Sequence, residues 1–408
     1  MAQNNPRRRR YRPWREHYIP RRTKWIIALS LLGALLIGLT VTAFVKGWIE
    51  LPDFSQEPVE TQPPTQPPED TVIHIVAGGD VNITDKVVSV PDYNQALQDV
   101  LPILGNGDLT LMNFEGNVYG EPYGSLHKSS PTTLLDALRS AGVDVLQTAN
   151  SQAITNGLLG LAATKNAIKE ALMQPLGTYT NQEDFDRYKG YLIYEVNGIR
   201  IALVAFTKGM DGRNLPEGSE YCVNLLYTDY GSTYQKVNTD GIKSVLKAVE
   251  KESPDITIAM LHWGSEYNDQ LNPTQEKIVK LLKEQGVDAV IGNHPHYVQA
   301  MQYEEDSGFF LAYSLGDFMG DAEMAGTNYS VLLDLEITKD GRTGKAKITG
   351  YSYTPIYQVY DENGQLQILR IEDAMAAYEN TYIGRVTKEI YNAMKNALER
   401  IESRVNKK

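Results

Sequence analysis

Val287-Asp-Ala-Val-Ile-Gly-Asn-His-Pro-His296 is a short apolar run that stops abruptly at two histidines. Its β-branched residues predict a buried strand. Pro295 fixes its own φ and biases His294 toward extended backbone. Both imidazoles are therefore expected to project from one stiff segment just past a strand, where their ring nitrogens are free to bind a metal.

The same pattern occurs in Ile256-Thr-Ile-Ala-Met-Leu-His-Trp-Gly264, where a second buried run ends at His262. Three of the six histidines of the chain thus follow two predicted strands. Strands predicted at 72–77, 109–113, 143–148 and 309–314 carry or precede further side chains that suit a metal, namely Asp80, Asn113, Glu115, Asn150 and Asp317.

Segments with helical spacing, at 132–141, 158–171 and 273–285, alternate with these strands. The alternation predicts an α/β fold, in which ligands sit beyond the carboxyl ends of the strands. Asp, Glu, Asn and His together form the mixed donor set of a divalent-metal hydrolase centre with one or two ions. The strand at 199–206 is expected to end without a ligand, and the Gly- and Tyr-rich interval 211–239 to be an irregular lid or insertion.

The C-terminal part, residues 326–408, is expected to complete the main domain with strands and a helix. Strands are predicted at 329–337 and 345–353, around a turn at 339–342. A loop is expected at 354–364, followed by a charged helix at 372–407 that is interrupted at Gly384.

Charge is distributed very unevenly along the chain. Residues 1–24 carry nine Arg or Lys against one Glu, and the remainder has 30 basic and 50 acidic residues. The acidic main domain argues against a nucleic-acid partner. Residues 25–45 lack a formal charge, and about 20 residues are enough to cross a bilayer as a helix. The basic flank predicts a tail that stays in the cytoplasm.

The alternative to a retained transmembrane helix is a cleavable signal peptide. Residues 46–70 are rich in Pro, Gln, Thr and Glu, and they predict an extended linker. The expected location is therefore the cell membrane, with one span and an extracellular main domain. The lone Cys222 permits no internal disulfide.

Six short motifs occur in order between residues 75 and 321. They are Gly79-Asp80-Val81, Asn113-Phe114-Glu115-Gly116, Ala149-Asn150, Leu261-His262-Trp263-Gly264, Gly292-Asn293-His294-Pro295-His296 and Tyr313-Ser314-Leu315-Gly316. This order resembles the CapA family of poly-γ-glutamate capsule-synthesis proteins, a branch of the calcineurin-like metallophosphoesterase superfamily. The resemblance implies that residues 71–325 form a metallophosphoesterase-like layered α/β sandwich.

What the resemblance implies for the site is a metal centre for one or two ions of Zn, Mn, Fe or Mg. The expected metal ligands are Asp80, Asn113, Glu115, Asn150, His262, His294, His296 and Asp317. Glu115, Asn150 and His262 are the expected catalytic residues. Substrate contacts are expected from His127, Lys128, Trp263, Glu266 and Tyr267, although packing explains the Trp263-to-Tyr267 group equally well.

The sequence departs from the family pattern in the third motif. The usual Asn-Asn-His is here Asn150-Ser151-Gln152, and the acid that follows it is replaced by Thr155. The Asn expected after Ser-Leu-Gly is Asp317. The missing histidine belongs to the motif that protonates the leaving group, a contribution typically worth about 10²–10⁴-fold. His127 either replaces it in space or is a surface-loop histidine.

The expected function is biosynthesis, export or attachment of an anionic capsule polymer, poly-γ-glutamate, beside capsule-synthesis membrane proteins. A phosphoesterase-like site would carry it out. The alternative is a non-catalytic factor that binds or guides the polymer through a degenerate hydrolase site. The altered third motif favours the second reading, and the intact histidines favour the first.

Overall fold

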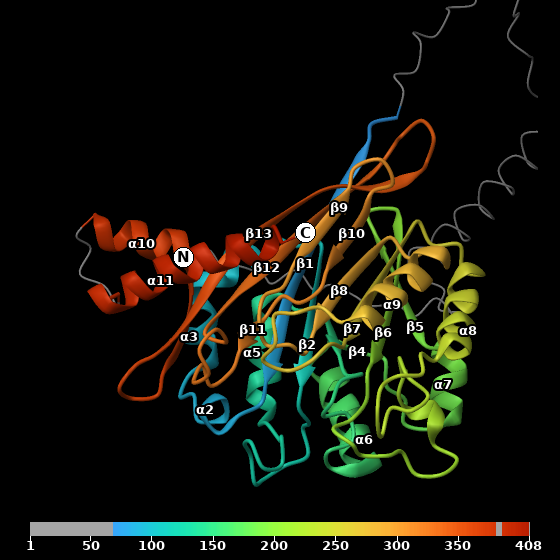
Figure 1. Ribbon diagram of the computed structural model, residues 1–408, viewed down its shortest axis with the longest axis horizontal. Coiled ribbons are helices and arrows are strands. Elements are labelled where there is room, and N and C mark those ends of the chain that lie inside the picture. Colours follow the sequence, from blue (N-terminus) through green and yellow to red (C-terminus); the bar gives the residue numbers. More distant parts are fainter. Residues whose placement is uncertain (1–67, 381–385, 408) are drawn as a thin grey trace, which may run out of the picture. The chain divides into compact units, whose positions relative to one another are not determined.

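Two β-sheets form the core of the part of the chain that the computed structural model describes, residues 68–380 and 386–407 (Figure 1). The first sheet has the order β14-β13-β12-β1-β2-β3-β4, with β11 beside β1, and the second has the order β5-β6-β7-β8-β10-β9. The strands are β1 (Thr71–Asn82), β2 (Leu109–Glu115), β3 (Val145–Gln147), β4 (Gln174–Leu176), β5 (Tyr191–Val196), β6 (Ile199–Thr207), β7 (Ile256–His262), β8 (Ala289–Asn293), β9 (Met301–Glu304), β10 (Phe309–Ala312), β11 (Asp317–Met319), β12 (Tyr329–Lys339), β13 (Ala346–Tyr360) and β14 (Leu366–Arg370).

The helices begin and end at residues that suit those positions. The structure describes α2 (Asp85–Val88), α3 (Tyr93–Leu97), α4 (Leu101–Leu104), α5 (Thr132–Ala141), α6 (Gly157–Glu170), α7 (Gln182–Tyr188), α8 (Thr239–Glu250), α9 (Pro273–Glu284), α10 (Ile371–Glu379) and α11 (Lys388–Val405). Asn272 caps α9 in a reciprocal capping box with Gln275, and Pro273 occupies the first turn. The helices predicted at 132–141, 158–171 and 273–285 are thus confirmed.

The sheets lie between two helical layers. On the first sheet, Leu134 and Leu138 of α5 and Ile168 of α6 pack against Met112 and Leu146. On the second sheet, α8 and α9 pack against the buried residues of β6 to β8 (Figure 1). Strand β1 contacts β8, and β4 contacts β6, so the other faces of the two sheets meet. The predicted α/β class is confirmed as a layered arrangement with two sheets.

Strands β1, β2, β3 and β4 pair in parallel, each with the next, in the first sheet, and β6, β7, β8 and β10 do so in the second. An aspartate stands immediately before β2, β3, β7 and β8, and we call these four the amino-end aspartates. Each one accepts a backbone N–H of the neighbouring strand and donates its own N–H to the carbonyl of that same residue. The pairs are Asp108 with His74, Asp144 with Thr110, Asp255 with Arg200 and Asp288 with Thr257.

A close backbone approach connects β1 to the loop before β11. The N–H of Asp80 donates to the carbonyl of Gly316 at 3.0 Å. A Cβ on Gly79 would stand 1.8 Å from that same carbonyl oxygen, so only glycine fits. The contact places the carboxylates of Asp80 and Asp317 at one end of the first sheet.

One C-terminal prediction needs correction. The predicted loop at 354–364 is wrong, because β13 continues to Tyr360 and pairs with β14. Ile356 and Ile368 bury their side chains in the first core, and that burial outweighs the loop-like Thr354-Pro355 signal. The helix predicted at 372–407 is confirmed as α10 and α11, and Gly384, where its interruption was predicted, lies outside the described residues.

No helix within residues 68–380 and 386–407 is long and apolar enough to cross a membrane. The transmembrane helix predicted at 25–45 lies outside the described residues, as do the basic tail and most of the linker.

Candidate metal centre

The carboxyl ends of four strands bring six of the expected ligands together, and the start of β11 adds a seventh. Strand β1 carries Asp80 and β2 carries Asn113 and Glu115, while β7 ends at His262. His294 and His296 follow β8, and Asp317 begins β11. Three groups each hold ligand atoms within 4.8 Å of one another: Glu115, His294 and His296; Asp80, His296 and Asp317; and Asp80, Glu115 and His262. All six of these residues are buried.

One half of the cluster has potential metal-binding atoms that lack a hydrogen-bond partner. Glu115 Oε2, His262 Nε2 and His294 Nδ1 are buried and lack a hydrogen bond. His262 Nε2 lies 3.6 Å from Glu115 Oε1, beyond hydrogen-bond range. The rings of His262 and His294 lie 4.4 Å apart. Buried polar atoms without partners are costly, so this half is arranged as if for a ligand.

The other half is paired internally. His296 Nδ1 bonds to Asp317 Oδ1 at 2.7 Å, which leaves Nε2 of that ring for a metal. Asp80 accepts from Asn113 Nδ2 at 2.6 Å and from the N–H of His294 at 3.1 Å. A carboxylate that orients a metal-binding histidine in this way fixes the ring and raises its basicity.

The backbone at the two histidines differs from the prediction. His294 has φ 96° and His296 has φ 60°, so the extended geometry expected before Pro295 is wrong for His294. Left-handed backbone in residues other than glycine costs about 1–3 kcal/mol and clusters at functional sites. The hydrogen bond from the His294 N–H to Asp80 helps to hold this conformation.

Burial and charge set the protonation of the cluster. Burial lowers the pKa of His262 to about 4 and that of His294 well below the ordinary range, so both rings are neutral. Burial also opposes the charged form of His296, but Asp317, Glu115 and Asp80 raise its pKa well above the usual value. Burial raises the pKa of Asp80, whereas His262, His296 and Lys128 outweigh burial and lower the pKa of Glu115.

Asn113 and Asn150 lie next to one another within the cluster. Asn150 Nδ2 donates to Asn113 Oδ1 at 3.1 Å and to the carbonyl of Phe114 at 2.6 Å. Asn150 Oδ1 accepts the N–H of Gln152. Asn113 Nδ2 also lies 3.4 Å from His262 Nδ1. The two amides therefore brace the ligands, with one lone pair of each oxygen still open.

The expected substrate residues separate into three environments. Trp263 is fully buried, stacks on Tyr313 and donates to its carbonyl, so packing accounts for it. Tyr267 is exposed and stacks on His296 at 5.1 Å, with exposed Glu266 beside it. Lys128 donates to Asn82 at the end of β1. His127 is half-buried, and its carbonyl accepts from Asn156.

Lys208 is a further residue of the candidate site. It follows β6, the strand expected to end without a ligand. Its Nζ lies 3.0 Å from His294 Nε2, donates to the carbonyl of Gly264 and stands over the Tyr234 ring. The strand-end rule would have found it if lysine had been counted among the candidates. Asn293, whose buried Oδ1 lacks a partner, was missed in the same way.

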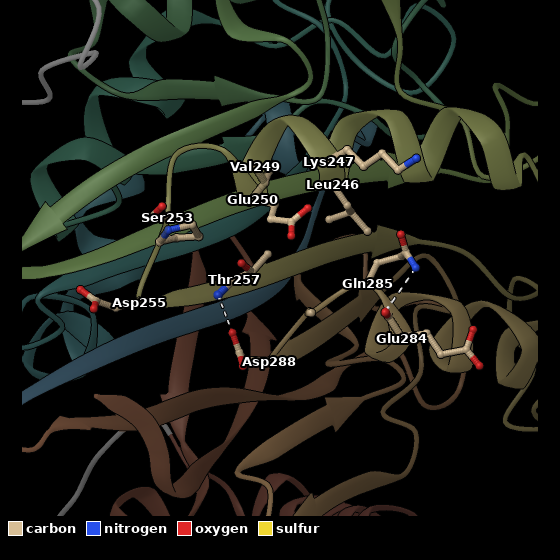
Figure 2. Close-up of a pocket in the computed structure, with 12 residues that line it drawn as sticks. Leu246, Lys247, Val249, Glu250, Ser253, Asp255, Thr257, Glu284, Gln285 and Asp288 are labelled. Carbon is tan, nitrogen blue, oxygen red and sulfur yellow. Dashed lines mark hydrogen bonds between the residues drawn. The ribbon is translucent and has the colours of Figure 1, made fainter. Parts of the chain in front are cut away.

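A hollow of about 670 Å³ lies at the opposite ends of the same strands. It is lined by residues before β7 and β8 and by the ends of α8 and α9 (Figure 2). Figure 2 shows Asp288 bonded to the N–H of Thr257, and the residues that line the hollow include no histidine. Size therefore does not identify the functional site, and the small histidine cluster has the chemistry that this hollow lacks.

The cluster suits a divalent metal. Its donors are imidazole nitrogens and carboxylate oxygens, the set that binds Zn, Mn or Fe, with Mg favouring the oxygens. Three of these metal-binding atoms, on Glu115, His262 and His294, are buried without a partner, and a bound cation would supply partners that the protein does not. Glu115 belongs to two of the three groups, and His296 also belongs to two of them.

Comparisons with known proteins agree with the motif order. Residues 74–322 match the family model for the bacterial capsule synthesis protein PGA_cap. The chain is 26% identical to the capsule biosynthesis protein CapA of Bacillus anthracis over 328 residues, covering 77% of this chain and 72% of the relative. It is 25% identical to the PGA biosynthesis protein CapA of Bacillus subtilis (strain 168) over 277 residues, covering 65% and 67%.

Two solved structures are also similar. One is a phosphatase from Mycoplasma pneumoniae, with 16% identity, TM-score 0.43, and 71% of this chain and 95% of that chain covered. The other is the calcineurin-like phosphoesterase YfkN from Bacillus subtilis, with 15% identity, TM-score 0.42, and 83% and 100% covered. The family match spans more than half of the sequence, and this chain belongs to the PGA_cap family of bacterial capsule synthesis proteins.

Proposed function

We propose that this protein is a metal-dependent, phosphoesterase-like hydrolase that acts on an anionic capsule polymer or its precursor at the outer face of the cell membrane. The observation that carries the proposal is that Glu115, His262 and His294 each keep one buried metal-binding atom without a partner, while Glu115 lies in ligand range of His262 in one group and of His294 in another. A structural cluster would pair these atoms, as it pairs His296 with Asp317. The printed names of the two relatives support the capsule context.

A divalent ion held by Asp80, Glu115, His262, His294 and His296 would polarise a phosphoryl or acyl oxygen. Asn113 and Asn150 keep these ligands in place. Glu115 also accepts from Ser151 at 2.8 Å, which leaves its second oxygen for the ion or for a proton of the attacking water. His262 is neutral near pH 7, because burial lowers its pKa to about 4, so it offers a lone pair without first losing a proton.

Substrate charge is matched locally rather than by the domain as a whole. The main domain is acidic and would repel a polyanion at long range. Lys208 lies next to His294, and Lys128 acts on Glu115, so two ammonium groups flank the centre. Tyr267 and Glu266 border it on another side. An anionic group that enters beside the lysines would have local neutralisation there.

The test is metal content of the full-length protein in detergent. We expect the parent to retain a divalent ion and a His262→Ala, His294→Ala double variant to lose it, with at least a hundredfold weaker affinity for added Mn²⁺ or Zn²⁺. His74→Ala is the matched control, because His74 is a half-exposed histidine paired with Asp334 away from the cluster. Equal metal uptake by the parent and the double variant would remove these residues from the site.

A second candidate function is a non-catalytic factor that binds or guides the polymer. The observation that favours it is Gln152 at the position of the family's histidine. The two functions separate on an aryl phosphate, which a metal-loaded hydrolase should cleave and a binding factor should not.

Membrane attachment through residues 25–45 and contact with capsule-synthesis membrane proteins complete the proposal. Protease added to intact cells should remove the main domain and spare an N-terminal tag. Recovery of a secreted form that begins near residue 46 would contradict the retained anchor.

A further inference from the structure

The three departures from the family's third motif form one hydrogen-bonded chain. Thr155 Oγ1 donates to Gln152 Oε1 at 2.7 Å, and Gln152 Nε2 donates to Ser151 Oγ at 3.2 Å. Ser151 Oγ in turn donates to Glu115 Oε1 at 2.8 Å. The altered residues therefore bond to one another and to the metal cluster, and they are not independent losses.

The same amide reaches an acid from another part of the chain. Gln152 Nε2 donates to Asp211 Oδ2 at 2.8 Å. Asp211 belongs to the irregular segment between β6 and α8 that the sequence marked as a lid or insertion. A carboxyl group thus stands next to the position where the family carries its histidine, although it comes from 59 residues further along.

The backbone holds Asp211 in an uncommon conformation. Its φ is 49°, in the left-handed region, and Gly212 follows with φ 74°. Met210, immediately before it, is fully buried and bridges to Arg213. Left-handed backbone at a residue other than glycine persists where the surroundings enforce it, and it is common at functional sites. Here it presents the carboxyl group to Gln152 while part of the side chain stays open to solvent.

The charges around Asp211 favour its protonated form. Burial and the charge of Glu115 raise the pKa of Asp211, and the bond from Gln152, Arg213 at 3.7 Å and Lys208 only partly offset them. Glu266, whose pKa is raised by burial, faces the same region, and Tyr234 contributes a further titratable group. A carboxyl group with a raised pKa is a competent proton donor.

We propose that Asp211 is the acid that protonates the leaving group, with Gln152 as the positioning residue that aims it. The proposal rests on the proposed phosphoesterase function. As water attacks phosphorus, the bond from phosphorus to the leaving oxygen breaks and its electron pair goes to that oxygen. The O–H bond of Asp211 breaks, and its proton joins the same oxygen, so that the alcohol leaves neutral. The proton lost by the attacking water passes to solvent, and solvent reprotonates Asp211.

His127 is the weaker candidate for this role. It lies in a loop after β2, is half-buried, and interacts with Asn156 through its backbone carbonyl. Within the described residues no hydrogen bond or ion pair joins the His127 ring to the cluster, whereas Asp211 is connected to Glu115 through Gln152 and Ser151.

The experiment compares two esters in the full-length, metal-loaded protein. An alkyl phosphate has a poor leaving group that needs a proton, whereas p-nitrophenyl phosphate needs almost none. We expect Asp211→Asn to lower kcat on the alkyl ester by about 10²–10⁴-fold and on the aryl ester by less than about tenfold. Metal content should be unchanged. Gln152→Ala should show the same selectivity for the alkyl ester at smaller size, with KM unaltered.

Asp229→Asn is the matched control, because Asp229 is an acid of the same segment whose carboxylate binds only within its own turn. It should leave both esters unaffected. Binding of inorganic phosphate, measured by calorimetry, gives a readout independent of turnover. We expect Asp211→Asn to bind phosphate as well as the parent does, and a large loss of that binding would mean that Asp211 shapes the site and does not donate a proton.

The outcomes distinguish the two proposals. If the parent hydrolyses both esters and Asp211→Asn slows them equally, or slows neither, the acid role is wrong and the phosphoesterase function stands. If the metal-loaded parent hydrolyses neither ester, the phosphoesterase function is wrong, and the acid role falls with it.

Discussion

Acidic side chains at the two ends of the parallel strands differ in their hydrogen-bond partners. At the amino ends, Asp108, Asp144, Asp255 and Asp288 each accept a backbone N–H of the neighbouring strand. At the carboxyl ends, Glu115 keeps one oxygen without a partner, beside two imidazoles with unpartnered nitrogens. Acidic side chains thus pair with the neighbouring strand at one end, and at the other end Glu115 lies among metal-binding atoms that have no partner. The difference is whether the protein supplies a hydrogen-bond donor to the carboxylate oxygens.

Unpartnered atoms alone are not enough to define the site. Tyr329 OH and Gln367 Oε1 are also buried without a partner in the described part of the chain. They are neutral and belong to no group of metal-binding residues, whereas Glu115, His262 and His294 each belong to a group whose ligand atoms lie within 4.8 Å of one another. A candidate metal centre is therefore recognised by unpartnered atoms of metal-binding types that lie close together, and not by single unpartnered atoms.

The largest effect on stability is expected when an amino-end aspartate is removed. Asp144 is buried, pairs with Arg139 at 2.8 Å and accepts the N–H of Thr110. Removing one partner of such a pair typically costs about 3–5 kcal/mol. We expect Asp144→Ala to lower the free energy of unfolding by that amount, measured in urea with chelator, while Mn²⁺ affinity at the carboxyl ends is unchanged. A loss below about 1 kcal/mol, or a parallel loss of metal affinity, would mean that the two ends are not separate in function.

The second prediction concerns the carboxyl ends. A ligand at a hundred times its dissociation constant stabilises the state that binds it by about 2.7 kcal/mol. Added Mn²⁺ should therefore raise the unfolding free energy of the parent by about this amount. It should have no effect on a His262→Gln, His294→Gln variant, in which two of the unpartnered nitrogens are gone. Equal stabilisation of both proteins would place the metal elsewhere.

Much of this contrast could be predicted from sequence, but not all of it. The apolar runs that precede Asp80, Glu115, His262 and His294 are clear in the sequence, so their strands and the meeting of these side chains at the strand ends were predictable. The roles of Lys208 and Asp211 were not, because each depends on which loops meet in space after β6. The left-handed φ of His294 was also missed, because a local rule about residues before proline yields to a tertiary bond with Asp80. Strand β14 was missed since its signal is burial against other elements.

Lys208 combines features of the two kinds of environment. Its ammonium group has hydrogen-bond partners, His294 Nε2 and the carbonyl of Gly264, although it lies beside residues that have atoms without partners. Donation by the ammonium to Nε2 places the proton of the neutral His294 ring on Nδ1, the atom that lacks a partner. A metal that binds at Nδ1 requires the ring proton to move to Nε2, which then no longer accepts from the ammonium group, and the ion must tolerate a nearby positive charge.

Lys208→Met should therefore bind Mn²⁺ more tightly, by about tenfold, or about 1.4 kcal/mol. Inorganic phosphate should bind more weakly to the same variant, because an ammonium group is lost beside the centre. Lys283→Met is the control, because Lys283 pairs with Glu304 on an exposed surface. Weaker metal binding by Lys208→Met would show that the lysine supports the ligands and does not compete with the ion.

The smallest effect is expected at Asp288, the amino-end aspartate shown in Figure 2. Burial raises its pKa, and the bond from the N–H of Thr257 offsets only part of that. An asparagine can still accept that N–H, so Asp288→Asn loses a charge-assisted bond but also loses the cost of a buried charge. The two terms oppose each other, and the net change at pH 7 should stay within about 1 kcal/mol.

The pH dependence of the unfolding free energy shows whether the folded protein favours the protonated or the ionised form of Asp288. A carboxyl group with a raised folded pKa binds a proton more tightly in the native than in the unfolded state. The native state is therefore penalised as pH rises from the ordinary value of 3.8 through the folded pKa. The unfolding free energy of the parent, relative to Asp288→Asn, should thus increase as pH falls from 7 toward 3.8. Urea denaturation of both proteins at several pH values measures this difference. The opposite slope would mean that Asp288 is stabilised as a carboxylate, and the amino ends would then depend on charge as well as on strand pairing.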